Sequence, residues 1–204
     1  QTVSIISQKG GSGKTTLTIG LSVEAAKAGR NVAIIDLDPQ ATAANWGDRR
    51  DTELPVVVSC QPARLSQVMA AAAGQGIDLA FIDTPGKSSE AAIAAAKVAD
   101  LVLIPIQPHL FDIETLANVR EILALAGNPT TLLVVNRAPV QGRRHTDAME
   151  ALEGAGYQFT PVVIYQRAAH SDAANLGKSA SEYDPTGKAA AELGELYANI
   201  IGSI

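Results

Sequence analysis

The residues whose types and spacing indicate chemistry lie near the start of the chain, at positions 8–16, which read QKGGSGKTT. Glycines let the backbone N–H groups of such a loop surround an anion, because no Cβ stands in the way. A helix that starts after the loop adds free N–H donors and the positive end of its dipole. Lys14 would then reach the β- and γ-phosphates of a nucleotide, and the Thr15 hydroxyl would hold Mg²⁺. The residues expected around the phosphates are Gly10, Gly11, Ser12, Gly13, Lys14, Thr15 and Thr16.

Carboxylates follow two other apolar runs. Asp36 and Asp38 come after residues 32–35, and Asp83 comes after residues 79–82. In open α/β sheets ligands bind at the carboxyl ends of the strands, so these side chains should lie beside the phosphate loop. Mg²⁺ keeps much of its water shell, and Asp83 would reach it through a water molecule. The alternative for each aspartate is a plain polar turn, in which this residue type is common.

Apolar runs alternate with helical patterns along the whole chain, which predicts a doubly wound, mostly parallel sheet of about seven strands with helices on both faces. The expected strands are 3–6, 32–35, 55–59, 79–83, 101–105, 131–137 and 159–164. The expected helices are 15–28, 41–50, 63–73, 88–99, 113–126, 146–154 and one from about 186. Pro161 places the last strand at an edge, where the lack of an N–H is tolerated.

Composition bounds the remaining possibilities. The chain has 204 residues, which suits one domain over 1–204, and we expect no separate N-terminal DNA-reading domain. Its formal charge of −5 argues against a generally basic nucleic-acid binder but allows a local basic patch. Cys60 is the only cysteine, so an internal disulfide and a cysteine metal cluster are both excluded. Every apolar run is shorter than a membrane span, so we expect a cytoplasmic location.

The phosphate loop departs from the common pattern G-x-x-x-x-G-K-[ST], because Gln8 stands at its first position and Lys9 adds a second lysine. Two glycines follow Lys9, which makes the phosphates of a partner subunit its more plausible target. The loop resembles the deviant Walker A motif of the ParA/MinD superfamily of ATPases, and the chain is most similar to small plasmid-type ParA partition ATPases. The resemblance implies ATP and Mg²⁺ as ligands, and a homodimer in which Lys9 reaches the ATP of the other subunit.

The same resemblance gives roles to the polar residues of two further loops. The sequence DLDPQ at 36–40 is similar to the first switch of the family, in which Asp38 positions the attacking water. Asp36 would support Lys14 and the Mg²⁺ shell. The sequence DTPG at 83–86 is similar to the second switch, in which the Gly86 N–H would sense the γ-phosphate.

Two pairs of residues are candidates for other contacts. An Asn side chain can donate to and accept from an adenine edge, and the family places Asn136 and Arg137 against the base. The alternative is a polar turn at the end of a strand. By resemblance, Arg167 and Lys178 would contribute to a nonspecific DNA surface, since phosphate contacts need only well-placed cations.

Other polar and amphipathic segments have ordinary explanations. The basic pair 143–144 is typical of a solvated face, with DNA contact as the alternative. Asp112 suits the N-cap of the helix 113–126. The amphipathic final helix carries glutamates on its polar face, which favours packing in the core over a membrane anchor.

The resemblance implies a slow Mg²⁺-dependent ATPase, stimulated by a partner, that works as a dimerising switch. With ATP it would bind DNA nonspecifically in the nucleoid, and a ParB-like centromere- or cargo-binding adaptor would trigger hydrolysis. The cargo would be a plasmid, a chromosome or a protein assembly. Alternatives are a metabolic P-loop enzyme similar to dethiobiotin synthetase, and a MinD-like spatial regulator.

Overall fold

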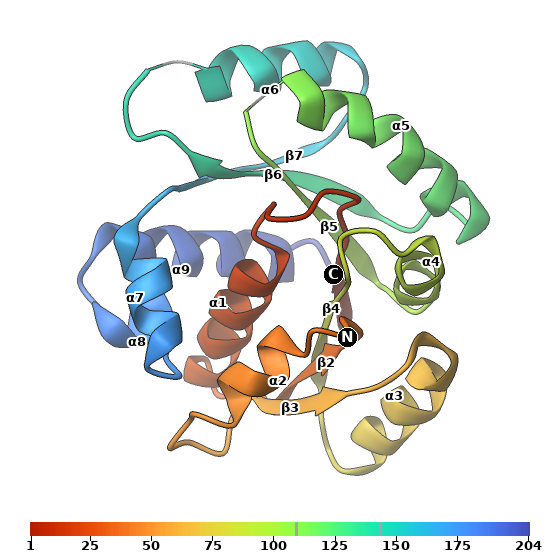
Figure 1. Ribbon diagram of the computed structural model, residues 1–204, viewed down its shortest axis with the longest axis vertical. Helices are drawn as coiled ribbons and strands as arrows, with labels where there is room; N and C mark the ends of the chain where they lie inside the picture. Colours follow the sequence, from red (N-terminus) through yellow and green to blue (C-terminus); the bar gives the residue numbers. More distant parts are fainter. Residues whose placement is uncertain (109, 143) are drawn as a thin grey trace.

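The computed structural model describes residues 1–108, 110–142 and 144–204 and shows, over these residues, one seven-stranded sheet in the order β3-β2-β4-β1-β5-β6-β7 (Figure 1). Every neighbouring pair of strands is parallel. The strands are β1 (Thr2–Ile5), β2 (Val32–Asp36), β3 (Val56–Ser59), β4 (Leu79–Asp83), β5 (Leu101–Ile106), β6 (Thr131–Ala138) and β7 (Phe159–Tyr165). The predicted fold class is confirmed.

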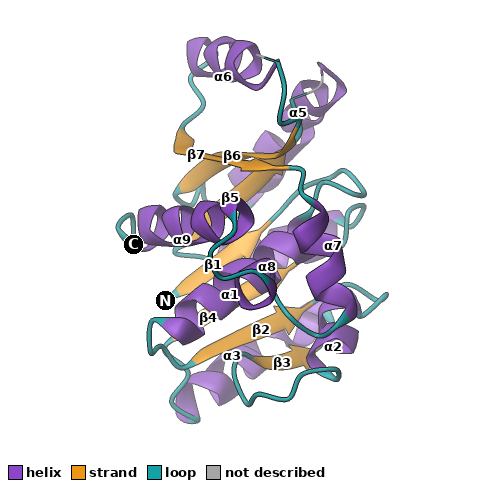
Figure 2. Ribbon diagram, turned by 90° about the vertical axis from the view of Figure 1, so that its left-hand side faces the viewer, coloured by secondary structure: helices purple, strands orange, loops and turns teal. Residues whose placement is uncertain are grey.

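Helices cover both faces of this sheet, and two layers of core follow from the alternation of side chains along each strand. The helices are α1 (Lys14–Lys27), α2 (Thr42–Gly47), α3 (Leu65–Gly74), α4 (Ser89–Lys97), α5 (Leu110–Leu125), α6 (Arg144–Gly154), α7 (Ala168–Asn175), α8 (Ala180–Tyr183) and α9 (Lys188–Ile201), with a 3₁₀ turn at Pro62–Arg64. Val3 and Ile5 pack towards α1 and α9, whereas Ile6 packs with the helices of the other face. Figure 2 shows α1, α8 and α9 together on the near side of the sheet.

Burial distinguishes the central strands of the sheet from its edge strands. All residues of β1, β2, β4 and β5 are buried, as expected for apolar strands covered on both faces. The two edges are β3, where Val56 and Val58 are exposed, and β7, which contains Pro161. The edge position of β7 agrees with the sequence analysis. The chain termini meet on one side of the molecule, where the Gln1 amide donates to the Ile204 carbonyl at 3.0 Å.

The start of α5 corrects one prediction. The helix begins at Leu110 instead of 113, so Asp112 lies inside it and is not the N-cap. Pro108 stands two residues before Leu110, where its fixed φ and missing N–H are compatible with an early helix start. The prediction for the side chains of the basic pair Arg143 and Arg144 lies outside the described residues.

The last helix packs in the core, as expected. Leu193, Leu196 and Ile200 of α9 are fully buried against α1 and the sheet. Over the ranges that the structure describes, no helix is long and apolar enough to cross a membrane.

The packing of α9 predicts a large difference between two Leu→Ala substitutions. Leu193 is fully buried, and Leu193→Ala should lower the free energy of unfolding by about 2–5 kcal/mol, because it leaves a cavity. Leu176 is 57% exposed, and Leu176→Ala should change the free energy by less than about 0.5 kcal/mol. Urea unfolding followed by circular dichroism measures both. Similar losses in the two variants would contradict the packing of α9.

Candidate functional site

The phosphate loop connects β1 to α1 at the carboxyl edge of the sheet. Gly13 is the N-cap of α1 and has φ of 88°, a left-handed conformation that other residues rarely adopt. A Cβ at Gly13 would lie 2.3 Å from the Asn136 side-chain nitrogen, so the site has no room for one. The loop therefore needs glycine here for two reasons, its backbone conformation and the close approach of β6.

Lys14 lies under this loop and is 7% exposed. Its ammonium donates to the Lys9 carbonyl at 3.2 Å. Burial lowers the pKa of Lys14, while the negative charges of Asp83 and Asp38 raise it. The cation and the two carboxylates therefore share one site, as the sequence analysis expected for residues at neighbouring strand ends.

Thr15 and Asp83 form the centre that could hold a metal ion. The Thr15 hydroxyl donates to the Asp83 carboxylate at 2.6 Å, and Asp83 is fully buried. Burial raises the pKa of Asp83 to about 7, against the lowering effects of the Thr15 hydrogen bond and of Lys14. A buried carboxylate beside further aspartates favours a nearby divalent cation, and hydroxyl and carboxylate oxygens are the ligands Mg²⁺ prefers. These residues fit Mg²⁺.

Asp36 orders the loop that carries Asp38. Its carboxylate is fully buried and accepts backbone N–H groups from Asp38 at 2.9 Å, Ala43 at 3.0 Å and Ala44 at 3.2 Å. Burial raises the pKa of Asp36, although these hydrogen bonds lower it. Asp36 thus fixes the start of α2 relative to β2. Its expected role beside Lys14 and Mg²⁺ stays a prediction.

The loop after β4 lies directly against the phosphate loop. A Cβ added to Gly86 would be 3.1 Å from the Gly10 Cα, which is tighter than ordinary contact. The Thr84 hydroxyl donates to the Ile5 carbonyl at 2.8 Å and ties the same loop to β1. The Gly86 backbone is therefore at the phosphate site, where the sequence analysis expected it.

Side chains from the ends of β5 and β6 hold the carbonyl groups of the phosphate loop. Gln107 and Arg137 donate to the Gly11 carbonyl at 3.0 and 2.7 Å, and Asn136 donates to the Ser12 carbonyl at 2.7 Å. Gln107 also accepts from the Lys9 ammonium at 3.4 Å. The sequence analysis assigned no contact to Gln107. Its contact depends on β5 lying beside β1, which the sequence does not encode locally.

A cavity of about 680 Å³ opens beside the loop and suits the nucleoside part of a nucleotide. It runs from the start of α1 past the ends of β6 and β7 to α7, and its lining includes Gly13, Thr16, Asn136, Arg137, Gln166, Arg167 and His170. Asn136 is 2% exposed and already bonded to the loop. It lies at the floor of the cavity, and its role as a reader of adenine stays a prediction.

Arg167 and Lys178 stand at opposite ends of α7, the former at its N-cap and the latter three residues beyond its last residue. The Arg167 guanidinium donates to Glu192 at 2.9 Å and lies over the Tyr165 ring at 5.4 Å. This ion pair gives Arg167 a role in joining α7 to α9. Lys178 is exposed, and its carbonyl accepts the Trp46 indole N–H at 3.1 Å. Of the two residues, Lys178 is exposed and Arg167 is partly buried.

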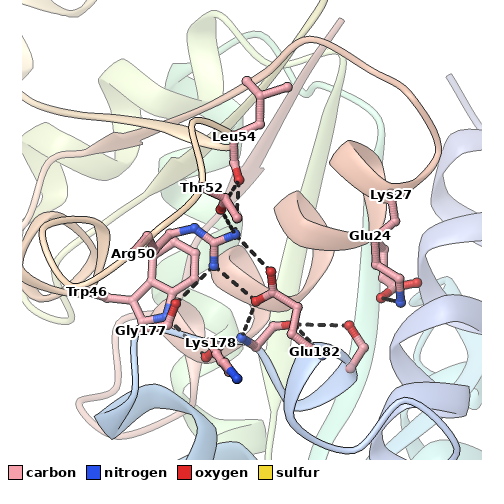
Figure 3. Close-up of polar contacts among 11 residues, drawn as sticks. Glu24, Lys27, Trp46, Arg50, Thr52, Leu54, Gly177, Lys178 and Glu182 are labelled. Carbon is pink, nitrogen blue, oxygen red and sulfur yellow. Dashed lines mark hydrogen bonds and ion pairs between the residues drawn. The ribbon is translucent and has the colours of Figure 1, made fainter.

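Arg50 anchors the segment containing Lys178, as Figure 3 shows. Its guanidinium donates to both Glu182 oxygens at 2.9 and 3.0 Å and to the Gly177 carbonyl at 3.0 Å. It also lies 4.4 Å from the centre of the Trp46 ring. Trp46 is buried and packs in the core. The residues after α2 and the segment between α7 and α8 are therefore held together by one nearly buried cation.

Removing this cation should destabilise the fold. The Arg50 side chain is 5% exposed, and Arg50→Met should cost about 3 kcal/mol of unfolding free energy by leaving Glu182 without its partner. The matched control is Lys27→Met, which removes a 49% exposed lysine paired with Glu24 and should cost less than about 1 kcal/mol. Chemical denaturation at pH 7 measures both.

The ion pair between Arg50 and Glu182 predicts that the free energy of unfolding depends on pH. Burial raises the pKa of Glu182, but hydrogen bonds from Arg50 and the Ser179 N–H outweigh it and hold the pKa below its usual 4.5. The stabilisation is thus complete above pH 4.5 and is lost as the pH falls further. The difference in the free energy of unfolding between wild type and Arg50→Met should therefore become smaller below pH 4.5. If this difference did not change with pH, Arg50 and Glu182 would not form a charged pair.

A parallel sheet, a glycine loop at its carboxyl edge and a Thr–Asp pair beside a buried lysine define a P-loop nucleotide-binding protein. The chain belongs to the CobQ/CobB/MinD/ParA nucleotide-binding domain family, whose sequence profile matches residues 3–180. This confirms the resemblance to ParA and MinD proteins.

Named relatives agree with this assignment. The chain is 25% identical to the maintenance of carboxysome distribution protein A of Halothiobacillus neapolitanus, over 99% of this chain and 97% of that protein. It is 24% identical to the chromosome-partitioning ATPase Soj of Thermus thermophilus, over 90% and 88% of the two chains. The septum site-determining protein MinD of Pyrococcus horikoshii, solved with Mg-ADP, superposes with a TM-score of 0.80 at 20% identity, over 98% of this chain and 95% of that one.

Proposed function

We propose that this protein is an ATP-dependent dimerising switch that positions or partitions a cargo in the cytoplasm. The observation that carries the proposal is the Thr15–Asp83 hydrogen bond beside buried Lys14, because it joins a metal-binding pair to a phosphate-binding loop. Relatives named for carboxysome distribution and chromosome partitioning support a role in positioning. The proposal has three parts, which are hydrolysis, dimerisation and DNA binding.

In the hydrolysis step Thr15 and Asp83 would hold Mg²⁺, and the ion would supply positive charge to the phosphates. Lys14 reaches the β- and γ-phosphates once its ammonium leaves the Lys9 carbonyl. Asp38, on the loop that Asp36 orders, positions the attacking water. The Gly86 N–H donates towards the γ-phosphate. Phosphoryl transfer needs positioning and charge more than covalent chemistry. Turnover is therefore slow as long as some of these groups are not in position, and a partner completes the site.

In the dimerisation step Lys9 crosses to the nucleotide of a second subunit. Its ammonium donates to the Gln107 side chain at 3.4 Å, whereas the Lys14 ammonium donates to the Lys9 carbonyl at 3.2 Å. The two lysines therefore point to different places, which supports different phosphates as their targets. Because hydrolysis removes the γ-phosphate, the dimer would last only as long as ATP does.

In the third step the ATP dimer binds DNA nonspecifically on the nucleoid, and a ParB-like adaptor on the cargo stimulates hydrolysis and release. Lys178 is exposed and carries a positive charge at the end of α7. A dimer doubles each such cation, and phosphate contacts add with the number of cations. The chain's net charge of −5 requires the DNA surface to be local.

The cross-subunit role of Lys9 predicts the behaviour of Lys9→Ala. Light scattering with Mg²⁺ should show wild type as a dimer with ATP and a monomer with ADP. Lys9→Ala should still bind ATP, because Lys14 and Thr15 remain, but should stay monomeric. Lys27→Ala, which removes a lysine far along α1, is the control and should dimerise normally. An ATP dimer of Lys9→Ala would reject the cross-subunit contact.

DNA binding should depend on ATP and on Lys178. Fluorescence anisotropy with a random duplex at low salt should show binding with ATP, weaker binding at higher salt, and none with ADP. Lys178→Ala should weaken binding several-fold without changing the dimer, with Lys27→Ala again as control. A protein that stays monomeric and binds no DNA with any nucleotide would instead favour a metabolic P-loop enzyme.

A further inference from the structure

The phosphate loop needs support from outside, because its backbone is rich in glycine. Gly11 and Gly13 have φ of 76° and 88°, and glycine changes its backbone conformation at little cost. The peptide groups between residues 11 and 13 could therefore rotate until their carbonyl oxygens face the interior of the loop. A carbonyl oxygen carries partial negative charge and would repel a phosphate there. A loop that binds phosphate must keep these peptide groups from rotating.

Three side chains hold the two carbonyl groups concerned. Gln107 and Arg137 donate to the Gly11 carbonyl at 3.0 and 2.7 Å. Asn136 donates to the Ser12 carbonyl at 2.7 Å. The donors come from the ends of β5 and β6, which are strands outside the loop and its own helix. The rest of the sheet therefore fixes the orientation of both carbonyl groups.

The orientation of each carbonyl also sets the orientation of the next N–H. A trans peptide is planar, and its C=O and N–H point in opposite directions. The Gly11 carbonyl shares a peptide group with the Ser12 N–H, and the Ser12 carbonyl shares one with the Gly13 N–H. Because both carbonyls point towards the strand-end side chains, both N–H groups point away from these side chains. This is the arrangement that a phosphate inside the loop requires.

The backbone of Arg137 is strained at the same place. Its φ of 54° lies in the left-handed region, which is unfavourable for an L-residue with a long side chain. Such conformations persist only where the surroundings fix them, and they occur preferentially at functional sites. The strained residue directly follows Asn136, and both side chains reach the loop. The strain thus coincides with the contacts that hold the loop.

The contact with the loop occupies the donor of Asn136. This side chain is 2% exposed, and its nitrogen is the atom that donates to the Ser12 carbonyl. A Cβ at Gly13 would lie 2.3 Å from the same nitrogen, so the amide packs directly against the loop. Asn136 therefore contacts the loop through the group that a base would need as donor.

We propose that Asn136 and Arg137, together with Gln107, are positioning residues that fix the peptide groups of the phosphate loop. Asn136 acts on the phosphates through the loop, instead of reading the adenine base. The inference rests on the proposed function, because it requires a ligand whose phosphates occupy the loop. It concerns the affinity for phosphate, whatever group the phosphate carries.

The first test compares ATP with inorganic tripolyphosphate, which has the phosphates without the nucleoside. Calorimetry with Mg²⁺ should show that Asn136→Ala weakens the binding of both ligands about tenfold, through the loss of one hydrogen bond. Asn175→Ala is the control, because Asn175 is an exposed asparagine at the end of α7, and it should change neither affinity. A loss of ATP binding alone would show that Asn136 reads the base.

Arg137→Gly separates positioning of the loop from stability of the fold. Glycine adopts a φ of 54° without strain, so the thermal midpoint of unfolding should not fall. Tripolyphosphate binding should nevertheless weaken about tenfold, and Arg137→Lys, which keeps a donor, should recover part of it. The matched control is Asn128→Gly, at another residue with positive φ in the turn after α5, which should leave tripolyphosphate binding unchanged.

The salt concentration separates the hydrogen bond of Arg137 from its charge. Salt screens the attraction between an exposed cation and an anion, but it does not restore a lost hydrogen bond. The ratio of wild-type to Arg137→Gly affinity for tripolyphosphate should therefore be the same at low and high salt. A ratio that approaches one at high salt would show that Arg137 acts through its charge alone.

Other outcomes would also overturn the inference. Unchanged tripolyphosphate affinity in Asn136→Ala and Arg137→Gly would show that the loop does not need these contacts. The proposed function would survive that result, because the wild type would still bind ATP. Failure of the wild type to bind either ligand would reject the proposed function and this inference with it.

Discussion

The burial of Asp83 at the end of β4 is the constraint on which the site depends. A carboxylate in that position must be protonated, hydrogen-bonded or neutralised, and burial raises its pKa to about 7. Thr15 and Lys14 provide partial compensation. The fold holds β4 between β1 and β2, so that the phosphate loop, the Asp36 loop and Asp83 meet at one edge. In the proposed function, a divalent cation held by Thr15 and Asp83 would supply the positive charge that this carboxylate lacks.

The ends of the neighbouring strands contribute different parts of the site around Asp83. The ends of β1, β2 and β4 carry the groups proposed to bind phosphate and metal, whereas the ends of β5 and β6 hold the loop in shape through Gln107, Asn136 and Arg137. The end of β7 and the start of α7 close the larger cavity. Because each contribution comes from a different strand end, the strand order itself builds the site.

The sequence was sufficient for the fold class, the seven strands in chain order and the loop between the first strand and the first helix, because these follow from local patterns and from strand ends. It was not sufficient for α7 and α8, which lie between the last strand and the last helix, where no helix was expected. It was insufficient where a contact depends on which strands are neighbours. Gln107 meets the loop only because β5 lies beside β1, and Arg167 pairs with Glu192 across 25 residues of chain. The start of α5 was misplaced because an N-cap aspartate and an aspartate inside the first turns look alike in sequence.

The setting of Trp46 has a practical consequence. It is the only tryptophan of the chain, so the indole emission of the protein comes from one place. That ring lies on the helix whose first turn is fixed by Asp36, its N–H is bonded to the Lys178 carbonyl, and the Arg50 guanidinium lies over its face. A rearrangement of the Asp38 loop or of the segment 177–182 would change the polarity and quenching around it. The molecule thus carries a built-in optical probe, whose emission spectrum would report such a rearrangement without a label.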